Sequence, residues 1–141
     1  MKILNSALAL VLLASCATSP MSYNKASPVS ASNLLEGYDR YSQPKEGSIR
    51  VIVVRDSGML GAAAPVKLSI DGIAVAKLWP SQRIELFFAP HDYIFAIEPS
   101  PRLSGALVER EIVIKSGKSY AFRISLDWGG AFSLQQSTHL Q

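Results

Sequence analysis

The chain has few of the side chains that enzymes and metal proteins use for chemistry. Its 141 residues include one cysteine, Cys16, and two histidines. A single cysteine forms no internal disulfide, and with so few thiols and imidazoles the usual zinc ligand sets are missing. Also missing are a Gly-x-Ser-x-Gly turn, a His-Glu-x-x-His motif, a phosphate-binding loop and a dinucleotide fingerprint. We therefore expect no catalytic residue, no metal and no cofactor, and we expect that the protein is not an enzyme.

Runs of like charge are missing as well. The formal net charge is +3, from 14 basic and 11 acidic residues, and charges of both signs are interspersed. There is no basic patch interleaved with aromatic side chains, which nucleic-acid-binding proteins carry. We expect no nucleic-acid partner and no small-molecule substrate. A weakly basic surface is compatible with anionic lipid headgroups.

The remaining acid–base candidates do not combine into a site. His91 and Asp92 are adjacent, so on a strand their side chains point to opposite faces. Glu109 and Glu111 share a strand face, where we expect them to keep the sheet soluble. His139 lies in a polar tail, predicted as residues 137–141, that we expect to be mobile.

The first fifteen residues have the features of an export signal. Lys2 precedes an apolar stretch over residues 3–13. This stretch is too short for a transmembrane helix, which needs about 20 apolar residues. Its length is typical of the apolar part of a signal peptide, so we assign residues 1–15 to a leader that is removed.

The leader ends in Leu13-Ala14-Ser15-Cys16, which resembles the lipobox of bacterial lipoproteins. The resemblance implies cleavage between Ser15 and Cys16, with lipid (diacylglycerol and, by acylation of the new amine, palmitate) on Cys16. Each CH₂ group of an acyl chain that enters the membrane contributes about 0.8 kcal/mol to binding. One acyl chain therefore binds a protein to the membrane only marginally, whereas two or three anchor it permanently. Ala17 resembles the residue that directs such proteins to the outer membrane, so we expect a lipid-anchored protein on its periplasmic face. The alternative is an ordinary signal peptide that leaves Cys16 without a role.

Residues 16–46 are predicted to be the lipidated cysteine followed by a flexible linker. Residues 17–46 are rich in Ser, Ala, Pro and Asn, and neither a strand nor a helix period persists. A flexible coil of this length spans about 30 Å root-mean-square. Within it, residues 33–41 place Tyr38 and Tyr41 three apart, so this part is either a short helix that docks or plain linker.

A folded domain is predicted over residues 47–136, where the pattern changes to alternating apolar and polar residues. Turn signals such as Asp71-Gly72 separate the alternating segments. The pattern predicts an all-β fold, an antiparallel β-sandwich of seven to eight short strands. The predicted strands cover residues 48–55, 65–70, 73–78, 83–88, 93–98, 108–115, 120–128 and 132–136.

Three short motifs in this domain resemble those of PEGA-like domains, which also occur in small envelope lipoproteins. They are the Asp-Gly turn within residues 66–73, the Pro-x-x-Tyr turn over residues 88–93 and the Gly-Lys-Ser-Tyr strand start within residues 114–120. The resemblance covers about residues 48–127 and departs from the family at His91, where the family has glycine. It implies a small β-sandwich associated with the cell envelope, and it implies no reaction.

Two places are candidates for contact with a partner. Met59 and Leu60 lie in a loop of small residues, where apolar side chains are unexpected. Trp79 follows the end of a strand and is either a binding anchor or the closure of the core. Trp128 has the same ambiguity.

We expect a lipid-anchored cell-envelope protein with a non-enzymatic interaction or structural domain and an envelope protein partner. One alternative is an accessory lipoprotein of a secretion or transport complex. Another is a glycan- or peptidoglycan-binding module, which would use Trp79 or Trp128 as an aromatic platform.

Overall fold

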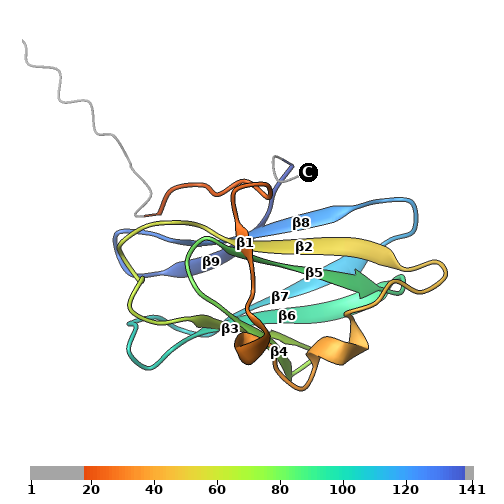
Figure 1. Cartoon of the computed structure of the whole chain (residues 1–141), viewed down its shortest axis with the longest axis horizontal. Coiled ribbons are helices and arrows are strands. Elements are labelled where there is room, and N and C mark those ends of the chain that lie inside the picture. Colours follow the sequence, from red (N-terminus) through yellow and green to blue (C-terminus); the bar gives the residue numbers. More distant parts are fainter. Residues whose placement is uncertain (1–17, 139–141) are drawn as a thin grey trace, which may run out of the picture.

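The computed structural model describes residues 18–138, and strands dominate this part of the chain (Figure 1). The predicted all-β sandwich is confirmed. All eight predicted strands are present with small shifts at their ends, and a ninth, β1, precedes them. The elements are β1 (Ser27–Pro28), the 3-10 helices η1 (Ala31–Asn33) and η2 (Tyr38–Arg40), β2 (Ile49–Arg55), β3 (Val66–Ile70), β4 (Ile73–Leu78), β5 (Gln82–Phe88), β6 (His91–Pro99), β7 (Val108–Ile114), β8 (Tyr120–Leu126) and β9 (Phe132–Gln136).

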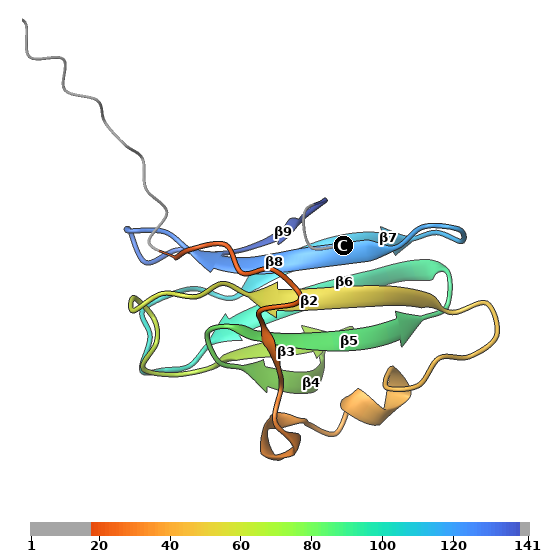
Figure 2. The same ribbon diagram turned by 45° about the horizontal axis from the view of Figure 1, so that its top comes forward.

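The strands form two facing sheets (Figure 2). One sheet has the order β1-β5-β2-β8-β9 and the other has the order β4-β3-β6-β7. Most neighbours are antiparallel, but β2 pairs with β8 in parallel, and β1 pairs with β5 in parallel. The β3–β4 hairpin turns at Asp71 and Gly72, whose φ angles of 49° and 78° are the positive values that a tight two-residue turn requires.

The core lies between the sheets and follows from the alternation of each strand. In β5, Ile84, Leu86 and Phe88 face inward, while the residues between them are partly exposed. Phe95, on β6, joins the two sheets because its ring centroid lies 5.4 Å from Phe88 and 5.6 Å from Phe122. Such aromatic pairs add to the stability gained from burying apolar area.

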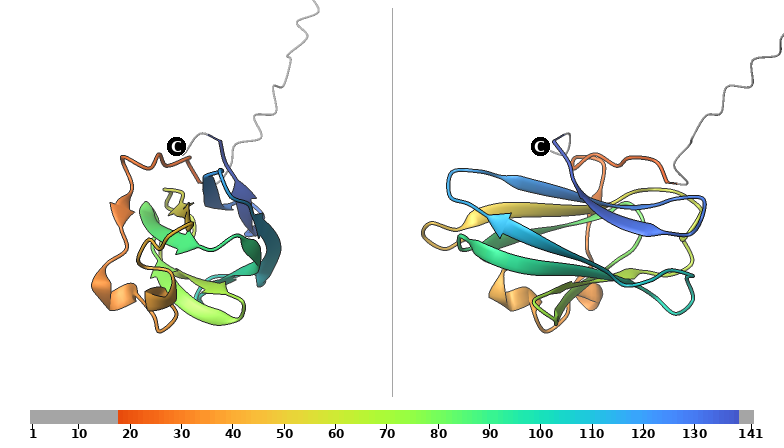
Figure 3. Two further views of the ribbon diagram at one scale, coloured as in Figure 1. Left: turned by 90° about the vertical axis from the view of Figure 1, so that its right-hand side faces the viewer. Right: turned by 180° about the vertical axis from the view of Figure 1, so that it is seen from behind.

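Residues 18–46, which we call the strap, correct the prediction of a flexible linker. The strap follows one side of the sandwich from the first sheet to the second (Figure 3, left). Its β1 extends the first sheet, and the amides of Leu35 and Gly37 donate to β4 at the edge of the second. Tyr41 stacks on Phe88 with 4.5 Å between ring centroids. The strap therefore closes the side of the sandwich, and of the two alternatives for residues 33–41, docking on the domain is the one observed.

The strap also explains why β2 is buried on both faces. Ile49, Val51 and Val53 face the core, but Ile52 and Val54 are buried too. They form a second apolar cluster with Ala26 and Ala121, against which Met21 and Tyr23 pack. A central strand covered on both faces needs apolar residues on both, as β2 has from Val51 to Val54.

Several predictions concern residues outside the described range. These are the leader over residues 1–15, cleavage between Ser15 and Cys16, lipidation of Cys16 and the position of His139. Within residues 18–138, no helix is long and apolar enough to cross a membrane.

Candidate functional site

One end of the sandwich gathers four loops, and we call it the apolar end. Here β2, β4, β6 and β8 end, and β3, β5, β7 and β9 begin, as the pairing registers require. The loops cover residues 56–65, 79–81, 100–107 and 127–131. This end lies at the left of Figure 1 and at the right of the rear view in Figure 3.

The apolar end carries five of the seven exposed large hydrophobic side chains found in residues 18–138. The other two, Ile94 and Val113, lie on the outer face of the second sheet. Such a concentration at one end of the sandwich is typical of a contact site rather than of scattered surface variation. The five and their exposed fractions are Met59 95%, Trp128 68%, Leu107 54%, Leu60 38% and Trp79 37%.

The three residues that the sequence predicted as contact candidates therefore lie at the same end of the sandwich. Met59 and Leu60 form the tip of one loop, and Trp79, which is partly buried, comes from the next loop along the chain. Trp128, for which the sequence left the same alternatives as for Trp79, lies at this end as well, and the structure adds Leu107, which the prediction did not include. The Gly-Gly sequence after Trp128 was a signal for an exposed turn, whereas nothing local distinguished Leu107.

Arg55 holds the base of the Met59–Leu60 loop. Its side chain lies inside the protein, and the residue is only 3% exposed. One guanidinium nitrogen, Nη1, donates to the carbonyls of Ala64 at 3.0 Å and Leu78 at 2.8 Å, and Nη2 donates to the carbonyl of Gly61 at 2.7 Å. Burial lowers the pKa of Arg55 to about 10, so the group stays protonated at neutral pH. A fixed cation thus organises the loop through backbone carbonyls.

A buried carboxylate connects the same region to the strap. Asp56 is 1% exposed and forms a bidentate ion pair with Arg123, whose Nε lies 3.1 Å from Oδ1. The same oxygen accepts a hydrogen bond from the backbone N–H of Met21 at 3.3 Å. Pairing and hydrogen bonding offset the cost of burying the charge. The strap is therefore attached beside the loop that carries Met59.

The first residues of the strap are attached to the apolar end itself. The Thr18 hydroxyl accepts from the amide of Leu126 at 3.2 Å and lies 3.4 Å from the carbonyl of the same residue. Ser19 and Ser57 exchange two backbone hydrogen bonds, of 2.8 and 3.1 Å. The described chain thus begins at the apolar end.

Farther along the strap, Tyr23 lies within a charged cluster on the outer face of the first sheet. Its ring centroid is 4.3 Å from the Arg83 guanidinium carbon and 5.1 Å from that of Arg50. Its hydroxyl bonds to Glu85, which also accepts two bonds of 2.9 Å from Arg50. These hydrogen bonds, that from Arg50 first, lower the pKa of Glu85 to about 2.

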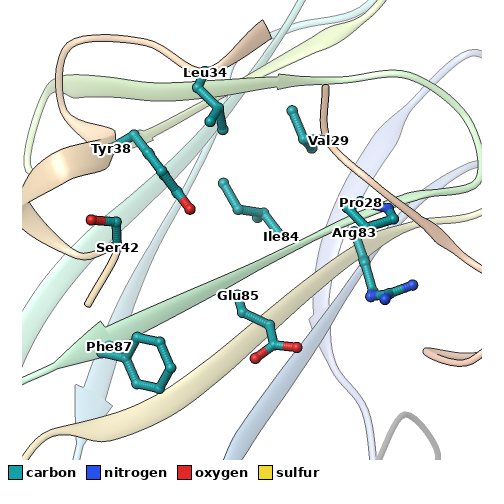
Figure 4. Close-up of a pocket in the computed structure, with 9 residues that line it drawn as sticks. All are labelled: Pro28, Val29, Leu34, Tyr38, Ser42, Arg83, Ile84, Glu85 and Phe87. Carbon is teal, nitrogen blue, oxygen red and sulfur yellow. The ribbon is translucent and has the colours of Figure 1, made fainter. Parts of the chain in front are cut away.

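A groove of about 290 Å³ lies between the strap and β5. Figure 4 shows Leu34 and Tyr38 of the strap on one side and Ile84, Glu85 and Phe87 of β5 on the other. The charged groups at this groove are already engaged, since Glu85 is bound to Arg50 and the strap, and Arg83 donates to strap carbonyls. We therefore do not assign a ligand to it.

The acid–base candidates within the described residues lie on β6 and β7. His91 and Asp92 begin β6 at the end opposite the apolar end, where the His91 ring meets the edge of Tyr93 at 5.5 Å. Glu109 and Glu111 are exposed on β7. Within residues 18–138, no group of three or more His, Cys, Asp or Glu side chains is arranged to hold a metal ion.

No known protein family matches this chain, and no curated protein has a detectably similar sequence. The resemblances to bacterial lipoproteins and to PEGA-like domains therefore stay predictions.

Proposed function

We propose that this protein is a bacterial lipoprotein, held in the cell envelope by lipid on Cys16, whose β-sandwich makes contacts rather than performs a reaction. The sequence over residues 13–16 is the basis for the anchor. The periplasmic face of the outer membrane is the location that Ala17 favours. The sandwich then acts as an interaction domain, with Met59, Leu60 and Trp79 in its contact surface.

The observation that best supports this proposal is the attachment of Thr18 to Leu126. Thr18 follows Cys16 by two residues, and two residues of extended chain reach at most about 7 Å. Lipid on Cys16 would enter a membrane beside the exposed side chains of this end. The anchor and the contact surface would thus belong to one end of the molecule.

The experiment compares the tagged full-length protein with Cys16→Ser in a bacterium that processes lipoproteins. We expect the wild type in the outer-membrane fraction and Cys16→Ser in the soluble periplasmic fraction, because the thiol is the acceptor for lipid. Ser57→Ala, which leaves Cys16 in place, is the matched control and should fractionate as the wild type does. Equal membrane retention of wild type and Cys16→Ser would contradict the anchor.

The same samples separate the alternatives. If soluble Cys16→Ser sediments with purified cell wall, the glycan-binding alternative is supported instead. If it leaves the membrane but co-purifies with one secretion or transport component, the protein is an accessory lipoprotein of that complex.

A further inference from the structure

We infer that the apolar end rests on the lipid bilayer itself, with its loop tips in the headgroup region. This inference rests on the proposed anchor at Cys16, and it identifies the occupant of the contact surface as a lipid surface. Three features of the described chain carry it: the kind of side chains at this end, the distribution of charge and the rigid attachment of the strap.

The exposed side chains at the apolar end suit a membrane interface. Tryptophan is enriched at the level of the headgroups, where its ring is partly apolar and its N–H remains hydrated. Both tryptophans of the chain, Trp79 and Trp128, lie at this end. Met59 and Leu60 project from the longest of the four loops, and a hollow of about 280 Å³ lies between Leu60 and Trp128.

Charge is distributed unequally between the two ends of the sandwich. In the four loops of the apolar end, the charged residues with exposed side chains are Arg102 and Asp127. Arg102 is suited to pair with a lipid phosphate. The segments at the opposite end carry five charged residues, namely Lys45, Glu46, Asp71, Lys115 and Lys118. Since charged groups resist leaving water, the apolar end can approach lipid at lower cost than the opposite end.

The strap keeps the apolar end directed at the bilayer. A flexible linker of thirty residues would let the domain turn freely, but here the strap is hydrogen-bonded to the domain from Thr18 onward. The two residues of chain between the proposed lipid site and Thr18 reach at most about 7 Å when extended. A bilayer that holds lipid on Cys16 would therefore lie within reach of the apolar end. Contact with lipid would then follow from the anchor alone, whereas contact with a protein would need a further partner.

The test uses tryptophan emission, because both tryptophans report on this end. The full-length lipidated protein is reconstituted into vesicles of phosphatidylethanolamine and phosphatidylglycerol whose acyl chains are either ordinary or brominated. We expect emission to shift to shorter wavelength on binding and to lose most of its intensity with brominated chains. The Trp79→Phe variant, which leaves the more exposed Trp128 as reporter, should behave in the same way.

Two variants form a matched pair. Met59→Asp with Leu60→Asp places charge in the loop tip, and Ile94→Asp with Val113→Asp places it on exposed residues of the second sheet. We expect both to float with vesicles through the anchor, with quenching lost only in the first. Circular dichroism verifies that each remains folded.

The outcomes separate the anchor from the contact. Lipidated protein that floats with vesicles but shows no quenching overturns the lipid contact while the anchor stands, and a protein partner is then the better occupant of the apolar end. Protein that fails to float overturns the anchor, and the lipid contact with it. Quenching that persists in the loop variant overturns the insertion of the Met59–Leu60 loop tip into the headgroup region.

Discussion

Arg55 ends β2 with its guanidinium inside the protein, where a charge is costly unless hydrogen bonds replace water. Its partners are the backbone carbonyls of Gly61 and Ala64, in the second half of the loop over residues 56–65, and that of Leu78 at the end of β4. The guanidinium carbon of Arg55 also lies 5.7 Å from the centroid of the Phe132 ring. One side chain thus connects the loop that presents Met59 to both sheets.

Arg55→Met should therefore destabilise the protein. The methionine fills similar space but donates no hydrogen bond, so three carbonyls lose a charged donor. We expect the free energy of unfolding to fall by about 2–4 kcal/mol in urea titration. Arg50→Met, on the same strand but in a partly exposed ion pair, should cost less than about 1 kcal/mol. Equal losses for the two variants would contradict a special role for Arg55.

Glu85 gives the protein a defined dependence on acid. Its pKa is about 2 in the folded protein against an ordinary value of 4.5, chiefly because Arg50 donates to the carboxylate. A lowered folded-state pKa stabilises the protein above pH 4.5, and this contribution is lost as the pH falls toward 2. We expect Glu85→Gln to show a smaller decrease in unfolding free energy over that range than the wild type. Identical decreases would show that the carboxylate contributes nothing.

At the scale of elements, the strap converts an open sandwich into a closed one. β1 and the amides of Leu35 and Gly37 satisfy groups at sheet edges that would otherwise be open to pairing with other chains. Tyr41 completes an aromatic group with Phe88 and Tyr93, at centroid distances of 4.5 and 6.4 Å. The strap is thus part of the folded unit.

Tyr41→Ala tests how far the strap contributes to stability. Loss of the stacked ring should lower the unfolding free energy by about 2 kcal/mol and speed proteolytic cleavage within residues 18–46. Asp39→Ala, an exposed change in η2, is the control and should leave both measurements unchanged. If cleavage of the strap is as fast in the wild type as in Tyr41→Ala, the strap is not held by this contact.

The sequence predicts some of these elements well and others not at all. The eight main strands follow from alternation, which is local, and the Asp71-Gly72 turn follows from glycine's tolerance of positive φ. The strap is not predictable in this way, since β1 is two residues long and its partners are more than fifty residues away. The apolar character of Ile52 and Val54 was the one sequence indication of the strap. A strand with apolar residues on both faces must be covered on both, and the strap covers the second face.

The candidate site divides in the same way. Met59, Leu60 and Trp79 are conspicuous one at a time, because each is apolar in a loop or at a turn. Their convergence with Trp128 depends on the long-range pairings that set which strand ends meet, including the parallel β2–β8 pair. No local pattern contains that information.

At the scale of the whole molecule, the two ends of the sandwich have different characters. The chain enters at the end with exposed apolar residues, and the charged turns lie at the other end, away from Thr18. A protein anchored at Cys16 would present the charged end and the outer face of β6 and β7 to the periplasm. Those surfaces are then the ones available to a protein partner.

The most direct test of this account is the mass of the amino-terminal peptide of protein purified from bacterial membranes. The account predicts a chain that begins at Cys16 and carries the added mass of diacylglycerol and an amide-linked acyl chain. A peptide that begins at Met1, or one that begins at Cys16 with a free thiol, would contradict it.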